Sequence, residues 1–136
     1  MSSTAAFDAI HDQLTASWAE TPLMFENDPL PALVDQETFV YVEIFGDQAM
    51  QDTFGDPGHN EWVEEGAAYL HVMVPDGTGS REARAIAGRL SLLFREVSLG
   101  TMQFTGISIG NGDPGQSFPN YFAMTVTLAW NRRDTI

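Results

Sequence analysis

The sequence contains no cysteine and no lysine, and its first basic residue is Arg81. Without cysteine the chain forms neither disulfide bonds nor thiolate metal sites, and this absence leaves the cellular compartment open. No apolar run approaches the ~20 residues that a helix needs to cross a bilayer. The N-terminus also lacks the charged-then-apolar pattern of a secretion signal. We therefore expect a chain that makes no use of a membrane.

Charge is distributed unevenly along the chain. Residues 1–80 carry fifteen of the nineteen acidic residues and no basic residue, whereas residues 81–136 carry four acidic residues and six arginines. The two parts have formal charges of −15 and +2, which sum to −13. So acidic a surface repels phosphate backbones and argues against nonspecific binding of nucleic acid. Two interpretations remain: a solubilising surface, or an assembly in which one half of each chain meets the other half of a neighbour.

The length of 136 residues and the 43% apolar content predict a single domain over residues 1–136. Its centre is the stretch Ala68–Val97, where a strand, a turn and a long helix follow one another. The strand is predicted over 62–74, because its side chains alternate with a period of two. Thr78 or Ser80 can cap the helix that follows. From Arg81 to Val97 the period becomes helical, and the predicted buried face comprises Ala83, Ile86, Ala87, Leu90, Phe94 and Val97.

The other elements follow from the same periodicities. A first helix carries Phe7, Ile10, Leu14 and Trp18 on one face and ends at Thr21-Pro22, because a residue before proline leaves the helical region. Strands are predicted over 23–27, 38–45, 103–109 and 121–131. The resulting order, α-β-β-β-α-β-β, predicts an α+β domain in which two helices pack on a mixed, mostly antiparallel sheet.

Two connections and one strand carry further expectations. The strand at 38–45 is apolar on both faces, which predicts helices over one face and a partner over the other. Residues 46–60 and 110–120 are polar and rich in glycine, so both are predicted to be contact loops. Residues 46–60 are predicted to form either a mobile loop or a long hairpin excursion. We expect this segment to be mobile in the free protein and to become ordered on assembly.

Candidate chemical sites are weak. Residues 77–80 could hold an anion, but no lysine follows as in a phosphate-binding loop, so a strand-to-helix turn is the better interpretation. His59 with Asp56 and Glu61 matches no known cation-binding spacing, and neither His11 nor His71 accompanies a nucleophile motif. Four aromatic residues could form a stacking platform but fit a core equally well: Tyr41, Trp62, Tyr69 and Trp130. We expect no catalytic residues, no cofactor and no metal.

The second helix carries an unusual outer face. Leu92 lies there among small and basic residues, and the whole set is Arg81, Arg84, Gly88, Ser91, Leu92 and Arg95. Arginine is suited to paired contacts with carboxylates. We therefore interpret this face as a subunit interface, with Leu92 as its apolar anchor. The predicted acidic counterpart on the neighbouring subunit includes Asp47, Asp52 and Asp56. A solvated helix face is the alternative.

Three stretches together resemble a known family. They are the strand FVYVEIFG, the strand–turn–helix VMVPDGTGSREARAIAGRLSLLF and the closing strand YFAMTVTLAW. With the N-terminal helix, this pattern is similar to that of the tail-terminator, or tail-completion, proteins of long-tailed phages and gene transfer agents. The resemblance covers nearly the whole chain, and its motifs describe a fold and a turn without a catalytic signature.

The resemblance implies a structural virion protein, not an enzyme. Such a protein forms a ring, usually a hexamer, that caps the finished tail tube and joins it to the head-completion protein. It is assembled in the host cytoplasm and resides at the head–tail junction, where DNA passes through the lumen without specific binding. A closed ring satisfies every lateral contact and leaves two different axial faces. The alternatives are another head–tail connector or a tail tube protein, and a small-ligand-binding or enzymatic module.

Overall fold

The computed structural model describes residues 3–26, 38–77, 79–95, 97–112 and 121–135. Two helices, α1 (Thr4–Ser17) and α2 (Arg81–Ser91), accompany six strands. The strands are β1 (Leu23–Phe25), β2 (Phe39–Gln51), β3 (Glu61–Pro75), β4 (Ser98–Leu99), β5 (Met102–Gly112) and β6 (Tyr121–Thr135). The order differs from the predicted one only by the short β4, whose two residues are too few to produce a recognisable period.

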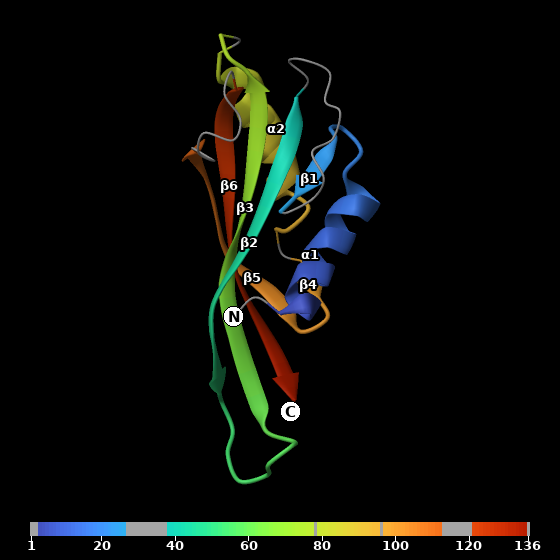
Figure 1. Cartoon of the computed structure of the whole chain (residues 1–136), viewed down its shortest axis with the longest axis vertical. Coiled ribbons are helices and arrows are strands. Elements are labelled where there is room, and N and C mark those ends of the chain that lie inside the picture. Colours follow the sequence, from blue (N-terminus) through green and yellow to red (C-terminus); the bar gives the residue numbers. More distant parts are fainter. Residues whose placement is uncertain (1–2, 27–37, 78, 96, 113–120, 136) are drawn as a thin grey trace.

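All six strands belong to one sheet in the order β1-β2-β3-β6-β5-β4. β1 is parallel to β2, and every other neighbouring pair is antiparallel. Both helices lie on the same face of this sheet (Figure 1). The chain is therefore a single-layer sheet with helices on one side, which confirms the predicted α+β class.

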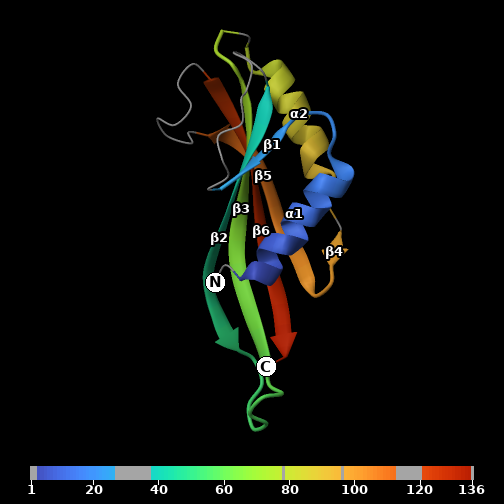
Figure 2. The same ribbon diagram turned by 45° about the vertical axis from the view of Figure 1, so that its right-hand side comes forward.

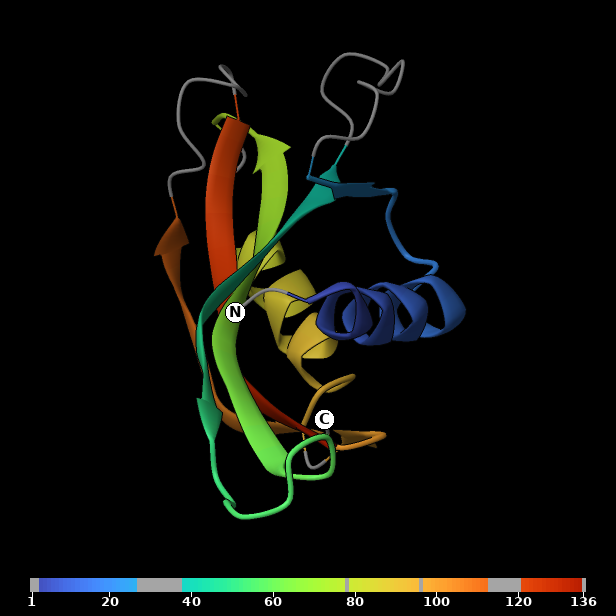
Figure 3. The same cartoon turned by 60° about the horizontal axis from the view of Figure 1, so that its bottom comes forward.

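β3 and β6 form the centre of the sheet. They pair over their full length, from Glu61 opposite Thr135 to Pro75 opposite Tyr121. The sheet is strongly twisted and curved, and the helices occupy its concave side (Figure 3). The curvature lets one sheet enclose two helices without a second sheet.

The hairpin between β2 and β3 is longer than predicted. After an irregularity between Gly46 and Ala49, β2 resumes its pairing with β3 and ends at Gln51 opposite Trp62. Of the two alternatives predicted for 46–60, the long hairpin is therefore confirmed and a loop over the whole segment is wrong, because Gly46 and residues 49–51 pair with the long β3 despite the local polar composition. The loop is reduced to 52–60. We call residues 46–66 the hairpin arm; it extends past both helices at one end of the molecule (Figure 2).

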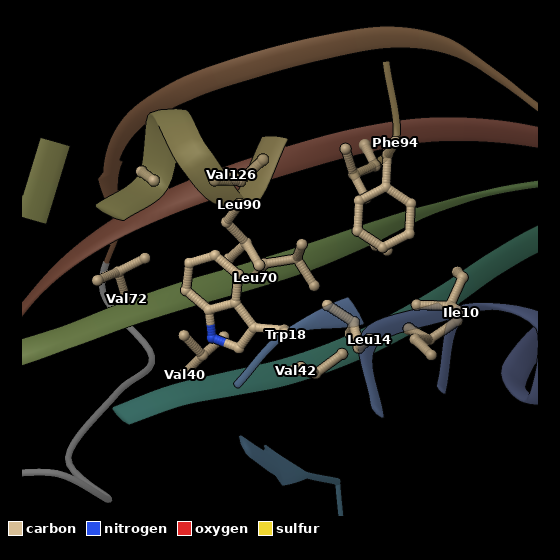
Figure 4. Close-up of a cluster of buried hydrophobic side chains, with 14 of the residues drawn as sticks. Ile10, Leu14, Trp18, Val40, Val42, Leu70, Val72, Leu90, Phe94 and Val126 are labelled. Carbon is tan, nitrogen blue, oxygen red and sulfur yellow. The ribbon is translucent and has the colours of Figure 1, made fainter. Parts of the chain in front are cut away.

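The main core lies between the helices and the sheet (Figure 4). Ala83, Ile86, Ala87, Leu90 and Phe94 are all buried, which confirms the predicted inner face of the second helix except for Val97, which is only half-buried. They meet the helix-facing residues of the sheet, with Phe94 edge-on to Phe104 at 5.0 Å between ring centroids. The strand alternation of β6 is confirmed too, since Met124, Val126, Leu128 and Trp130 all belong to this core.

α2 ends earlier than predicted, at Ser91 instead of Val97. The N–H groups of Leu92, Leu93 and Phe94 donate to carbonyls three residues back, so the last turn tightens. This tightening still brings Phe94 into the core, although the helical period has ended. Ser80 begins the helix without a side-chain capping bond, and Thr78 lies outside the described residues.

α1 begins at a cap that also joins it to the sheet. Ser3 Oγ accepts from the N–H of Ala6, while the N–H and hydroxyl of Ser3 donate to the buried carboxylate of Glu64 at 2.8 and 2.9 Å. The helix ends at Ser17, four residues before the predicted Thr21-Pro22 stop. Trp18 leaves the helical path to bury its ring, and its Nε1 donates to Thr21 Oγ1 at 2.9 Å.

The opposite face of the sheet carries a second, smaller apolar cluster. Its buried members are Met24, Phe39, Met73 and Ala123, with Tyr41 and Tyr121 packed against them. Phe39 thus points away from the helices while Val40, Val42 and Ile44 point toward them. The predicted two apolar faces of this strand are confirmed; that a partner covers the second face stays a prediction.

Candidate assembly surface

The outer side of α2 presents the predicted basic face to solvent. Arg81, Arg84 and Arg95 are exposed, and 56% of Leu92 is accessible. Gly88 has open space above it, because a Cβ added there would meet nothing within 4 Å. We call these five residues the arginine stripe. Ser91 is excluded as a correction: it is 1% exposed, and its Oγ donates to the Gly88 carbonyl at 2.8 Å.

The six arginines divide into two groups of three. Arg89 pairs with Glu20, Arg132 lies 3.5 Å from Glu64, and Arg133 binds Asp52 and Glu61, each at 2.8 Å. Within the described ranges, no carboxylate lies within 4.0 Å of the guanidinium groups of the stripe. Among the described residues, the one polar side-chain contact of these guanidinium groups is from Arg84 Nε to Ser80 Oγ at 3.3 Å.

The paired arginines already form ion pairs with carboxylates of the same chain. The hydrogen bond from Arg89 is the main cause of the lowered pKa of Glu20; burial opposes it, and the charge of Arg89 adds a smaller lowering. Hydrogen bonds to Asp52 and Glu61 raise the pKa of Arg133 in the same way. The stripe therefore contains the basic groups that remain available to a partner.

The predicted acidic counterpart is spread along the hairpin arm. Asp47 lies in the irregular part of β2, Asp52 begins the hairpin loop and Asp56 lies within that loop. Asp52 is already bound by Arg133. The side chain of Asp56 is 75% exposed, with His59 Nδ1 at 3.6 Å. The structure brings neither Asp52 nor Asp56 to the stripe of the same chain. Any contact between these aspartates and the stripe must therefore join two copies of the chain.

Exposed large apolar side chains occur at or beside these two places, and Ile109 on β5 is a further one. The large apolar residues with the greatest exposure include Phe54 at 78%, Leu92 at 56% and Met50 at 53%. Phe54 and Met50 belong to the hairpin arm, and Phe45 directly precedes it. Single exposed apolar residues are common on protein surfaces. Here Phe54 is followed closely in the sequence by Asp56, and Leu92 lies on the arginine stripe, so each surface presents an exposed apolar side chain together with charged residues.

A polar cluster on the open sheet face was not predicted from the sequence. His71 Nδ1 lies 2.7 Å from Thr125 Oγ1, and His71 Nε2 lies 2.6 Å from Glu43 Oε1. Tyr41 and Tyr69 each stack against the His71 ring, at 6.0 and 6.3 Å between centroids. The alternation of side chains along each strand could have placed these residues on one face, but only the register of β2, β3 and β6 shows that all five are neighbours.

This hydroxyl–imidazole–carboxylate order resembles a catalytic triad but does not form one. Thr125 lies within a strand and is 6% exposed, so a substrate carbonyl cannot approach its hydroxyl. The neighbouring backbone N–H groups belong to strand ladders and are not free to bind an oxyanion. The arrangement instead satisfies the polar groups of a buried histidine.

The other chemical candidates are not assembled into sites. Glu61 binds Arg133 and not His59, and no group of three metal-ligating side chains occurs among the described residues. Trp130 is buried in the main core, whereas Trp62 lies half-buried on β3. A shallow hollow of about 600 Å³ beside α1 is lined by Ala5, Asp8, Ala9, Asp12, Gln13, Leu99 and Gly100. In the described part of the chain, no helix has the length and apolarity to cross a membrane.

Comparisons with known proteins identify the fold and no family. No protein-family model and no curated protein matches this chain. Solved structures of similar fold do exist: one chain is 24% identical, with 97% of this chain and 96% of that chain aligned at a TM-score of 0.56. At this level of identity the likeness shows the arrangement of helices and strands alone.

Proposed function

We propose that this chain is a tail-terminator protein of a phage-like particle. It forms a closed homo-oligomeric ring, a hexamer by resemblance, that caps the tail tube and presents its other side to the head-completion protein. The proposal combines the resemblance of three sequence stretches to that family with the candidate assembly surface. It assigns no catalytic residue, cofactor or metal to the chain.

The observation that carries the proposal is the arginine stripe. The chain has nineteen acidic and six basic residues. Three arginines nevertheless surround an exposed leucine without a carboxylate partner in the described structure. Arginine and large apolar residues are characteristic of the centres of protein interfaces. Such a group is more economically explained by contacts with another subunit than by a solvated helix.

A ring performs the task by geometry. Each subunit uses its lateral contacts within the ring, so no further subunit can add sideways, and the two axial faces differ. One face binds the last ring of the tube, and the other face does not repeat the tube surface, so elongation stops. The net charge of −13 repels DNA phosphates, which lets DNA pass through the lumen without binding.

The function is tested by mixing the protein with a polymerising tail tube protein from the same particle. An amount equal to one ring per growing end should stop elongation, and electron microscopy should show tubes with one closed end. The variant Leu92→Asp with Arg84→Glu should fail to stop elongation. Arg89→Gln is the matched control, because Arg89 lies on the same helix and outside the stripe.

Two results would contradict the proposal. Tubes that grow at the unperturbed rate in excess protein would show that the chain does not terminate them. Long filaments made by the protein alone would instead identify it as a tube protein, because a tube subunit must repeat its axial contact. Light scattering of the purified protein, with a mass that corresponds to a ring, supports the proposal independently.

A further inference from the structure

Hydrogen bonds anchor the two ends of the hairpin loop, and one aromatic ring between them lies in solvent. The N–H groups of Asp52 and Thr53 donate to the Glu61 carbonyl at 2.7 and 3.3 Å, and the N–H of Glu61 donates to Thr53 Oγ1 at 2.7 Å. Asn60, which is buried, accepts from the N–H of Asp56 through Oδ1 at 3.2 Å. Phe54 follows these anchored residues, and 78% of it is accessible.

The conformation after Phe54 requires glycine. Gly55 has a φ of 100°, which side chains with a Cβ rarely adopt, and a Cβ there would meet nothing within 4 Å. The turn therefore directs the chain back toward β3 immediately after the aromatic ring. A loop built in this way presents Phe54 as a projecting side chain and gives it no intramolecular pocket.

The geometry points to a head-to-tail contact between two copies of this chain, in which Phe54 of one copy packs on Gly88 and Leu92 of the next. This inference rests on the proposed function and specifies the lateral contact of the ring. Gly88 offers open space beside an exposed leucine, as an aromatic side chain requires. Aromatic anchors that fill a hollow beside apolar residues dominate many interfaces.

Charge makes a second copy the best occupant. The exposed carboxylate of Asp56 accompanies Phe54 on the loop, while Arg84 and Arg95, which bind no carboxylate of the described residues, flank Leu92 on the stripe. The two surfaces thus combine an apolar centre with charges of opposite sign. Arg133 keeps Asp52 within its own chain, so the inference assigns the intermolecular pair to Asp56 and not to Asp52.

The positions of the two surfaces fix the type of symmetry. The hairpin loop lies at one end of the molecule, beyond both helices, whereas α2 lies toward the other end (Figure 1). A single copy cannot bring its own loop to its own stripe. A contact between two different patches is heterologous, and repetition of it closes into a ring if the rotation between neighbours allows closure.

The absence of cysteine permits a direct test by cross-linking. In the variant Phe54→Cys with Gly88→Cys, mild oxidation should join each subunit to the next. A denaturing, non-reducing gel should then show a ladder of covalent species that ends at the ring number. Either single-cysteine variant should give dimers at most. The matched control is Met50→Cys with Gly88→Cys, because Met50 is exposed on the same arm but lies before the loop.

A mixing experiment tests the same contact without cysteine. Phe54→Asp and Leu92→Asp should each be monomeric in light scattering and native mass spectrometry. An equimolar mixture should contain 1:1 dimers and no larger species, because only one intact pair of surfaces remains. Met50→Ser should form the same oligomers as the unmodified chain.

The outcomes separate this inference from the function on which it rests. A ladder confined to dimers, or rings that persist in Phe54→Asp, would overturn the contact while unmodified rings that cap tubes still support the terminator function. Protein that neither forms rings nor caps tubes would contradict the function itself. Retained rings with lost capping in Phe54→Asp would reassign the loop to the tube and also overturn the inference.

Discussion

Nε2 of His71 lies 2.6 Å from Oε1 of Glu43 across the β2–β3 ladder. The two residues are 28 positions apart in the sequence. A neutral imidazole satisfies both of its contacts when Nε2 donates to Glu43 and Nδ1 accepts from the hydroxyl of Thr125. This network fixes the orientation of a buried ring on the sheet face opposite the helices, stacked against two tyrosines.

Removal of the Thr125 hydroxyl tests the network. Thr125→Val keeps the shape of the side chain but leaves a buried nitrogen of His71 without a partner, so it should lower the free energy of unfolding by about 1–3 kcal/mol. Thr127→Val, on the same strand and face, should change it by less than ~0.5 kcal/mol. Urea denaturation measures both values. Equal effects of the two substitutions would show that the His71 contact contributes nothing specific.

The core prediction concerns Phe94, which is fully buried although it follows the end of α2. Phe94→Ala removes a ring that packs edge-on to Phe104 and leaves a cavity. The free energy of unfolding should fall by about 3–5 kcal/mol. Leu92→Ala, two residues earlier in the same turn and exposed, is the control for shortening a side chain outside the core. A loss below ~1 kcal/mol for Phe94→Ala would contradict the assigned inner face.

The close approach at Gly66 gives a third prediction. A Cβ added there would lie 2.2 Å from the Phe45 carbonyl oxygen and 2.5 Å from Cζ2 of Trp130. The backbone oxygen cannot move without breaking the β2–β3 ladder, so Gly66→Ala should cost about 1–3 kcal/mol or prevent folding. Gly110→Ala is the matched strand control, because nothing lies within 4 Å of its added Cβ. Thermal melting compares the two; a stable Gly66→Ala protein would contradict the packing of Trp130 over this strand.

Tyr41 predicts a pH dependence at alkaline pH. Burial, with the nearby charges of Glu43 and Glu26, raises the pKa of Tyr41 above its ordinary value of 10.0. Because the pKa of Tyr41 is raised in the folded state, the contribution of its protonated phenol to the free energy of unfolding is fully present below pH 10. This contribution is lost as the pH rises through the folded pKa. The unmodified protein should therefore lose stability relative to Tyr41→Phe over this range. Melts from pH 8 to 11 measure the difference, and parallel curves for the two proteins would refute it.

Hydrogen exchange tests the corrected hairpin. The N–H groups in the β2–β3 ladder up to Gln51 should exchange slowly, whereas those of Phe54, Gly55 and Gly58, for which the described structure shows no acceptor, should exchange rapidly in the free protein. This result would confirm mobility only in the loop and not over the whole of 46–60. On assembly, the exchange at Phe54 and Gly55 should slow. Uniform protection from 46 to 60 without an oligomer would contradict mobility of the loop.

Sequence alone determined the fold class, most of the elements and the exposed stripe. Side-chain periodicity reports which side of an element faces an apolar interior. It therefore identified the inner face of α2, the alternation of β6 and the exposure of Leu92. The separation of acidic and basic residues was likewise readable without any structure, as was the lack of cysteine that makes the cross-linking test possible.

Tertiary structure decided the features that depend on which residues contact each other. The pairing of β2 with β3 turned residues 46–51 into strand, and core packing ended α2 at Ser91. Long-range contacts give three of the six arginines a carboxylate partner, whereas the other three have none among the described residues. The register alone brought Glu43, His71 and Thr125 together. Local sequence determines which face of the strand a side chain such as that of His71 points to. Its contact partners, however, lie 28 and 54 positions away in the sequence and are brought to it only by the folded sheet.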